Sequence, residues 1–146
     1  MFAIDTPSFV KLVTSSNEFE IQSSTLAEQK AQDEAVKSFA TQMIADHTKA
    51  AQDLAAALAE GGAEAPATPA LSPKHAAMLA LLEAADGADF QMLYVDMQAV
   101  AHMEAVDVIR TFAKGGYNEA VQAFASAALP TLVMHQEQIA EIIAAQ

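Results

Sequence analysis

Residues 36–61, VKSFATQMIADHTKAAQDLAAALAEG, decide the fold, because their apolar side chains recur every three or four positions. An α-helix turns once in about 3.6 residues, so this spacing places those side chains on a single face. Asp33 is a favourable N-cap ahead of the segment, and Gly61-Gly62 is a strong helix stop behind it. The segment therefore predicts a long amphipathic helix. Its inner face comprises Val36, Phe39, Ala40, Met43, His47, Ala51, Leu54 and Leu58.

The same period predicts a long helix at each end of the chain. Thr6-Pro7 combines an N-cap with proline at the first helical position, so a helix is expected from there to about Ala31. The last long helix is expected to begin near Asn118 and to continue to the C-terminus. Pro130 lies inside it and should kink it, because proline removes one backbone hydrogen bond.

The middle of the chain predicts a crossover followed by two more helices. Ala63–Leu71 is rich in alanine and proline and predicts an irregular connection. Ser72-Pro73 repeats the cap-and-proline pattern, and the short helix that follows is expected to end at Gly87. Asp89 is the expected cap of the third long helix, which ends at Gly115-Gly116.

These elements predict an all-α protein, specifically a ferritin-like four-helix bundle. Short turns make consecutive helices antiparallel, so the long helices should form two hairpins joined by a long crossover that contains the short extra helix. A chain of 146 residues has the usual size of one domain, and we expect residues 1–146 to form a single bundle domain.

Composition excludes several classes of function. The net charge of −12 disfavours nucleic acid and anionic membrane surfaces as partners. The absence of cysteine excludes disulfides, thiolate metal sites and thiol catalysis. No apolar run reaches the roughly 18 residues of a membrane span, and the start, MFAIDTPSF, lacks the pattern of a signal peptide. A homo-oligomer or an unidentified protein partner stays open.

Four polar residues occupy the apolar faces of the four long helices. Helical wheels place Glu20, His47, His102 and His135 inward, one on each helix, at depths that differ by about 5 to 8 Å within each hairpin. Buried polar groups need a partner, so this arrangement calls for an explanation. His75, in the short helix, is expected to be a surface or rim residue.

Three imidazoles and one carboxylate predict a mononuclear metal site with Glu20, His47, His102 and His135 as ligands. These groups suit a divalent ion of Zn, Fe, Mn, Cu or Ni, with no organic cofactor. Asp46 points about 100° away from His47 and is expected to orient an imidazole rather than to bind the ion. The competing interpretation is a hydrogen-bonded network without metal in a structural or interaction module. An enzyme that uses an open coordination position stays a further alternative.

Four phrases of the chain resemble a family of uncharacterised bacterial exported proteins, a domain of unknown function whose members are described as outer-membrane or periplasmic. They are FVKLVTSSNEFEIQSSTLAEQKA (9–31), VKSFATQMIADHTKAAQDL (36–54), GADFQMLYVDMQAVAHMEAV (87–106) and FASAALPTLVMHQEQI (124–139). The resemblance covers nearly the whole chain. It implies a ferritin-like helical bundle and a periplasmic location.

The family pattern carries over onto particular positions of this chain: Glu20, Asp46, His47, His102, Leu129-Pro130 and His135. One departure is Ala101, where the family commonly has an acidic residue. The pattern also lacks the paired Glu-x-x-His motifs of a di-iron ferritin, since Ile44 and Ala99 stand three residues before His47 and His102. Ferroxidase chemistry at a two-metal centre is therefore not expected.

Overall fold

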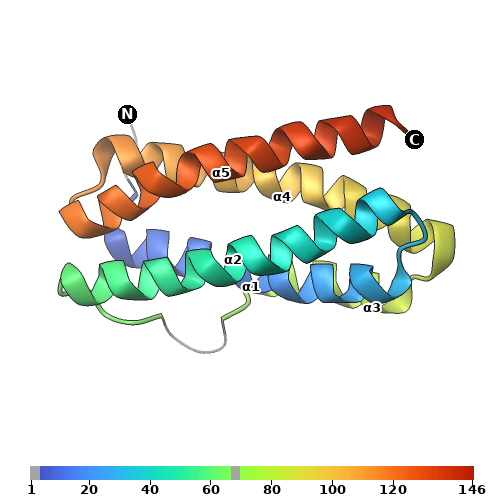
Figure 1. Cartoon of the computed structure of the whole chain (residues 1–146). Helices are drawn as coiled ribbons and strands as arrows, with labels where there is room; N and C mark the ends of the chain where they lie inside the picture. The colour runs from blue at the N-terminus through green and yellow to red at the C-terminus, as the bar shows by residue number, and fades with distance from the viewer. Residues whose placement is uncertain (1–3, 67–69) are drawn as a thin grey trace.

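A computed structural model describes residues 4–66 and 70–146, and over these ranges it contains five α-helices and no strand (Figure 1). The all-α class predicted from the sequence is confirmed. The helices are α1 (Thr6–Lys30), α2 (Glu34–Glu60), α3 (Pro73–Ala84), α4 (Gly87–Gly115) and α5 (Glu119–Ala144). Within the described part of the chain, no helix combines the length and apolar character needed to cross a bilayer.

The four long helices lie side by side, and the short α3 covers one side of them (Figure 1). α1 packs against α2, α4 packs against α5, and the two pairs meet through α1 with α4 and α2 with α5. Three residues connect the helices within each pair, whereas residues 61–72 and α3 connect the pairs. Residues 67–69 of the predicted crossover lie outside the described ranges. The arrangement places the inner faces of all four long helices around one interior.

Polar caps fix the helix starts, with one difference from the prediction. Asp33, Ser72 and Asn118 each accept a hydrogen bond from a backbone N–H of the first turn that follows. At α1 the cap is Asp5, whose Oδ1 accepts from the Ser8 N–H at 2.8 Å, and Thr6 is already helical. A carboxylate accepts this bond and also complements the positive end of the helix dipole.

The start of α4 was predicted wrongly. Gly87 opens α4 instead of ending α3, and Asp89 lies within the first turn instead of capping the helix. α3 ends at Ala84, which leaves only Ala85 and Asp86 to reverse the chain direction. Gly87 has φ of +58°, a conformation that glycine adopts without steric cost, so the glycine makes the reversal itself.

Two apolar clusters fill the interior, and the inward histidines lie between them. One cluster contains Phe39, Met43 and Tyr94, and the other contains Leu54, Phe112 and Phe124. On α2, α4 and α5 alike, the histidine falls between residues of the two clusters along the helix. The helical spacing of the sequence thus places the three histidines in one layer of the bundle.

Candidate metal centre

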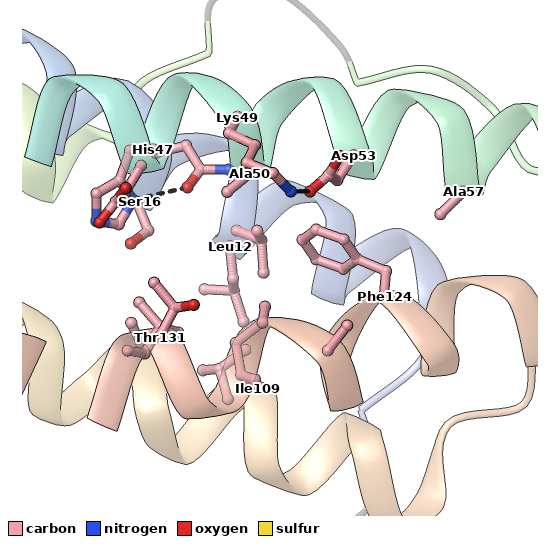
Figure 2. Close-up of a pocket in the computed structure, with 18 of the residues that line it drawn as sticks. Leu12, Ser16, His47, Lys49, Ala50, Asp53, Ala57, Ile109, Phe124 and Thr131 are labelled. Atoms are coloured by element: carbon pink, nitrogen blue, oxygen red, sulfur yellow. Dashed lines mark hydrogen bonds and ion pairs between the residues drawn. The ribbon is translucent and has the colours of Figure 1, made fainter. Parts of the chain in front are cut away.

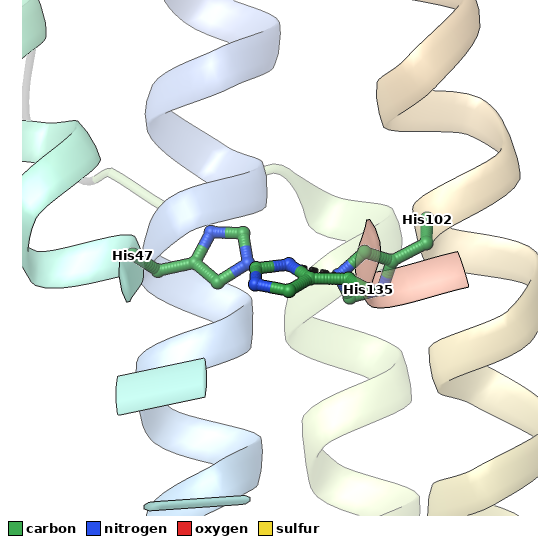
Figure 3. A group of neighbouring side chains, drawn as sticks. All are labelled: His47, His102 and His135. Carbon is green, nitrogen blue, oxygen red and sulfur yellow. Dashed lines mark hydrogen bonds between the residues drawn. The ribbon is translucent and has the colours of Figure 1, made fainter. Parts of the chain in front are cut away.

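His47, His102 and His135 converge from α2, α4 and α5 in the middle of the bundle (Figure 3). Their exposed fractions are 3%, 1% and 1%. One nitrogen from each ring lies within 4.8 Å of the other two, and the ring centroids are 5.2 to 5.7 Å apart. The structure therefore brings together three of the four residues predicted as metal ligands.

His102 and His135 face each other directly. His102 Nε2 lies 3.3 Å from His135 Nδ1, and His102 Nδ1 lies 3.0 Å from the backbone carbonyl of Gln98. A carbonyl oxygen only accepts hydrogen bonds, so His102 Nδ1 carries the proton. Burial, together with the nearby His135, lowers the pKa of His102 to about 4, and the ring is neutral near pH 7.

Asp46 holds the outer nitrogen of His135. His135 Nε2 donates to Asp46 Oδ2 at 2.8 Å across the interface of α2 and α5. Burial lowers the pKa of His135, whereas the hydrogen bond to Asp46 acts in the opposite direction. Asp46 thus lies where sequence reasoning expected it, beside an imidazole that it orients.

His47 is held in the same manner by Asn17 of α1. His47 Nδ1 lies 2.9 Å from Asn17 Oδ1, and His47 Nε2 has no hydrogen-bond partner. Burial, followed by the neighbouring His102 and His135, places the pKa of His47 well below its usual value. Sequence reasoning missed Asn17, although its position three residues before Glu20 places it on nearly the same helical face.

Glu20 lies beside the outer nitrogen of His102, apart from the three-histidine group. Its Oε1 is 3.8 Å from His102 Nδ1, and its Oε2 is buried without a partner. Burial raises the pKa of Glu20 to about 8, partly offset by the side chain of Gln98. The carboxyl group is therefore mostly protonated near pH 7, and Glu20 as a fourth ligand stays a prediction.

A cavity of about 470 Å³ adjoins the three-histidine group, and His47, His135, Asp46 and Asn17 contribute to its wall. Figure 2 shows His47 at one end and Ala57 and Phe124 toward the other. His75, predicted to be a surface or rim residue, lines the cavity outside the histidine group. It stacks on Phe19 and bonds to Ser15. Two of the three histidines, His47 and His135, thus line a space large enough for a small molecule.

Together, fold and site define an all-α protein with a buried cluster of three neutral histidines beside a cavity. The chain belongs to the family described as "Domain of unknown function (DUF4142)", whose profile matches residues 1–142. A search of curated proteins finds no match. The crystal structure of a DUF305 fragment from Deinococcus radiodurans is similar in fold, with a TM-score of 0.80 at 16% identity, over 96% of this chain and 95% of that one.

Proposed function

We propose that the protein binds one divalent transition-metal ion through His47 Nε2, His102 Nε2 and His135 Nδ1. The supporting observation is the set of outer hydrogen bonds to Asn17, Gln98 and Asp46. Each bond takes the single N–H of a neutral imidazole and leaves the other nitrogen as a lone pair. Three lone pairs that face a common point repel one another unless a cation lies between them.

The distances suit a small ion. Zn–N bonds of about 2.0–2.1 Å place two nitrogens of a tetrahedral ion about 3.3–3.4 Å apart. The His102 Nε2 to His135 Nδ1 distance is 3.3 Å. One nitrogen of each of the three rings lies within 4.8 Å of the other two, which is close enough for all three imidazoles to share one ion after side-chain adjustment. All-imidazole ligation suits Zn, Cu, Ni and Fe, and carboxylate-preferring Mn is the weakest candidate.

A hydrogen-bonded network without metal explains the same residues less well. Burial lowers the pKa of both His102 and His135, and between two neutral rings the proton would have to come from one of the outer hydrogen bonds. Moving this proton to the other ring nitrogen would leave a nitrogen lone pair facing an oxygen lone pair. The oxygen would be the Gln98 carbonyl in the case of His102, or Asp46 Oδ2, 2.8 Å from Nε2, in the case of His135. The network would also leave the buried His47 Nε2 without a partner, which costs about 1–3 kcal/mol.

A mononuclear metal enzyme is a second candidate, favoured by the cavity at the histidine group. Structural zinc sites use four protein ligands, whereas catalytic sites use three and keep one position open toward a pocket. Three histidines, of which His47 and His135 line a cavity, are closer to the second pattern. An ion there would lower the pKa of a bound water or polarise a substrate oxygen.

Elemental analysis and metal titration of the full chain purified without chelator test the proposal. We expect one ion per chain, with loss of about 100-fold or more in affinity in His47→Ala, His102→Ala and His135→Ala. His75→Ala is the matched control, because it lines the cavity outside the ligand set. No bound metal and no rise in melting temperature with Zn, Cu, Ni or Fe would refute the proposal.

We also propose that the bundle is ferritin-like and that the protein works in the periplasm. Two helix pairs joined by a long connection support the first statement. The family resemblance supports the second, and a site without cysteine suits an oxidising compartment. Fractionation of bacterial cells that express the natural gene tests the location, with a cytoplasmic marker protein as control.

A further inference from the structure

The cavity beside the three-histidine group has one polar end and long apolar walls. Its wall on α2 runs from Asp46 to Glu60, about 20 Å of helix. Beyond the histidines the walls are formed mainly by small side chains of α2, α4 and α5. They include Ala50, Ala57, Ala105, Ala123, Ala127 and Ala128. Alanines that face one another across a bundle leave space that larger core residues would fill.

Leu12 shows that this space suits an apolar molecule. It lines the cavity, yet its side chain is 48% exposed. A large apolar side chain that is open to solvent inside a concave, mostly apolar pocket is a common feature of ligand sites. The volume of about 470 Å³ lies within the usual range for small-molecule pockets, roughly 300–1,000 Å³.

The charges at the polar end favour an anionic head group. A divalent ion on three neutral imidazoles carries two positive charges, and Asp46 beside His135 offsets one of them. Among the other charged residues of the wall, Lys49 pairs with Asp53 and Glu104 pairs with Lys74, whereas Glu60 lies at the far end of the α2 wall, about 20 Å from Asp46. With the proposed ion bound, one uncompensated positive charge would therefore stay at the histidine end.

Asn17 supplies a second polar contact at that end. It is 6% exposed and lines the cavity, and its Oδ1 already accepts from His47. Its Nδ2 is buried without a hydrogen-bond partner. A small rotation of this amide toward the cavity would let a carboxylate that binds the ion through one oxygen accept from Nδ2 with the other, which would remove the cost of the unpaired donor.

We propose that the cavity binds a monoanionic amphiphile: a hydrocarbon body along the alanine-lined walls and a carboxylate on the ion held by the three histidines. This inference rests on the proposed metal centre. It specifies the ligand class as a carboxylic acid with an apolar chain, and it assigns Asn17 to the second carboxylate oxygen.

Calorimetric titration of the zinc-loaded full chain with acetate, butanoate, hexanoate and octanoate tests the inference. We expect one octanoate per chain and an affinity that rises about fourfold with each added methylene, because each is buried against apolar walls. Removal of zinc by chelation, or replacement of octanoate by uncharged octanol, should weaken binding by about tenfold or more, because the charged contact is lost.

Ala127→Phe fills the cavity without touching the histidine group, and it should weaken octanoate binding at least tenfold while zinc still binds. Ala123→Leu provides a second filled cavity if the first variant folds poorly. Ala140→Phe is the matched control on α5, because Ala140 is exposed and does not line the cavity, and it should bind octanoate as the unchanged chain does.

The outcomes separate the two proposals. Zinc binding without octanoate binding overturns the inference and leaves the metal centre standing, whereas failure to bind zinc overturns both. Equal affinity for acetate and octanoate would show that the apolar walls take no part. Equal octanoate affinity with and without zinc would show that the head group does not reach the ion.

Discussion

Asp46 of α2 and His135 of α5 form a carboxylate–imidazole pair across the two halves of the bundle, with 2.8 Å between Asp46 Oδ2 and His135 Nε2. The pair fixes the ring orientation and turns His135 Nδ1 toward His102. Such a carboxylate also makes the imidazole a stronger donor to a metal ion. Asp46 therefore acts on the proposed centre through His135.

Replacing Asp46 by Asn should lower metal affinity by about 10–100-fold, because the neutral amide orients His135 less strongly and makes it less basic. A competition titration with a chromophoric zinc chelator measures this loss. Asp53→Asn is the control, since Asp53 lies on the same helix and lines the cavity but pairs with Lys49. Equal zinc affinity in Asp46→Asn and the unchanged chain would contradict this role.

Replacing Asn17 by Ala should destabilise the metal-free protein by about 1–3 kcal/mol, because His47 Nδ1 then becomes a buried donor without an acceptor. Zinc affinity should fall as well, since the imidazole is no longer held in one orientation. Urea unfolding and zinc titration measure the two effects. Ser16→Ala, at the neighbouring cavity-lining position, should change neither, and a similar loss there would point to general damage to α1.

Glu20→Gln should change how the stability of the metal-free protein depends on pH. The pKa of Glu20 is raised from 4.5 to about 8, so between these values the folded state holds a proton that the unfolded state has released. The free energy of unfolding attributable to Glu20 therefore falls as pH rises from about 4.5 to about 8, by several kcal/mol at most. Glu20→Gln removes this loss.

The stability advantage of Glu20→Gln over the unchanged chain should therefore grow across that range. His102 acts with the opposite slope, because its lowered pKa makes stability rise between about pH 4 and pH 6.5. Both proteins share the His102 effect, so it cancels in the comparison. Unfolding curves at several pH values measure the difference, and a difference independent of pH would show that Glu20 ionises normally.

Ser15→Ala should loosen α3 from the rest of the bundle. Ser15 Oγ accepts from the Ser72 N–H at 2.8 Å and shares a hydrogen bond with His75 Nδ1, so one hydroxyl holds the start of this helix. Its removal should cost about 1–3 kcal/mol and speed amide hydrogen exchange in α3. Exposed Ser38→Ala is the control. Unchanged exchange in Ser15→Ala would show that apolar packing alone holds α3.

The sequence predicted the helices and the inward residues because both follow from local periodicity. His47, His102 and His135 each lie at the centre of an apolar stripe, and a helical wheel finds such positions without knowledge of packing. Their meeting point follows from the near-equal depths along antiparallel helices. The helical wheel also places Asp46 about 100° from His47, and on this basis Asp46 was predicted to orient an imidazole rather than to bind the ion.

What the sequence could not show depends on how the helices pack together. The pairing of Asn17 with His47 requires the contact between α1 and α2, and the position of Glu20 beside the outer nitrogen of His102 depends on side-chain rotation. The cavity could not be predicted, because an alanine that packs in a core and an alanine that lines a cavity occupy the same kind of position on the inner face of a helix. The predicted start of α4 was wrong because a glycine such as Gly87 is equally common where a helix ends and where the chain reverses direction before the next helix.

The three ligands proposed here belong to both halves of the chain, since His47 lies in the pair formed by α1 and α2 and the others lie in α4 and α5. Neither pair alone contains the complete set, so the site exists only after the two have docked. An ion held there would act as a reversible cross-link whose binding energy goes entirely into that docking. Chelation would therefore remove a stabilising link between the two helix pairs, while the apolar clusters that both pairs share keep them together.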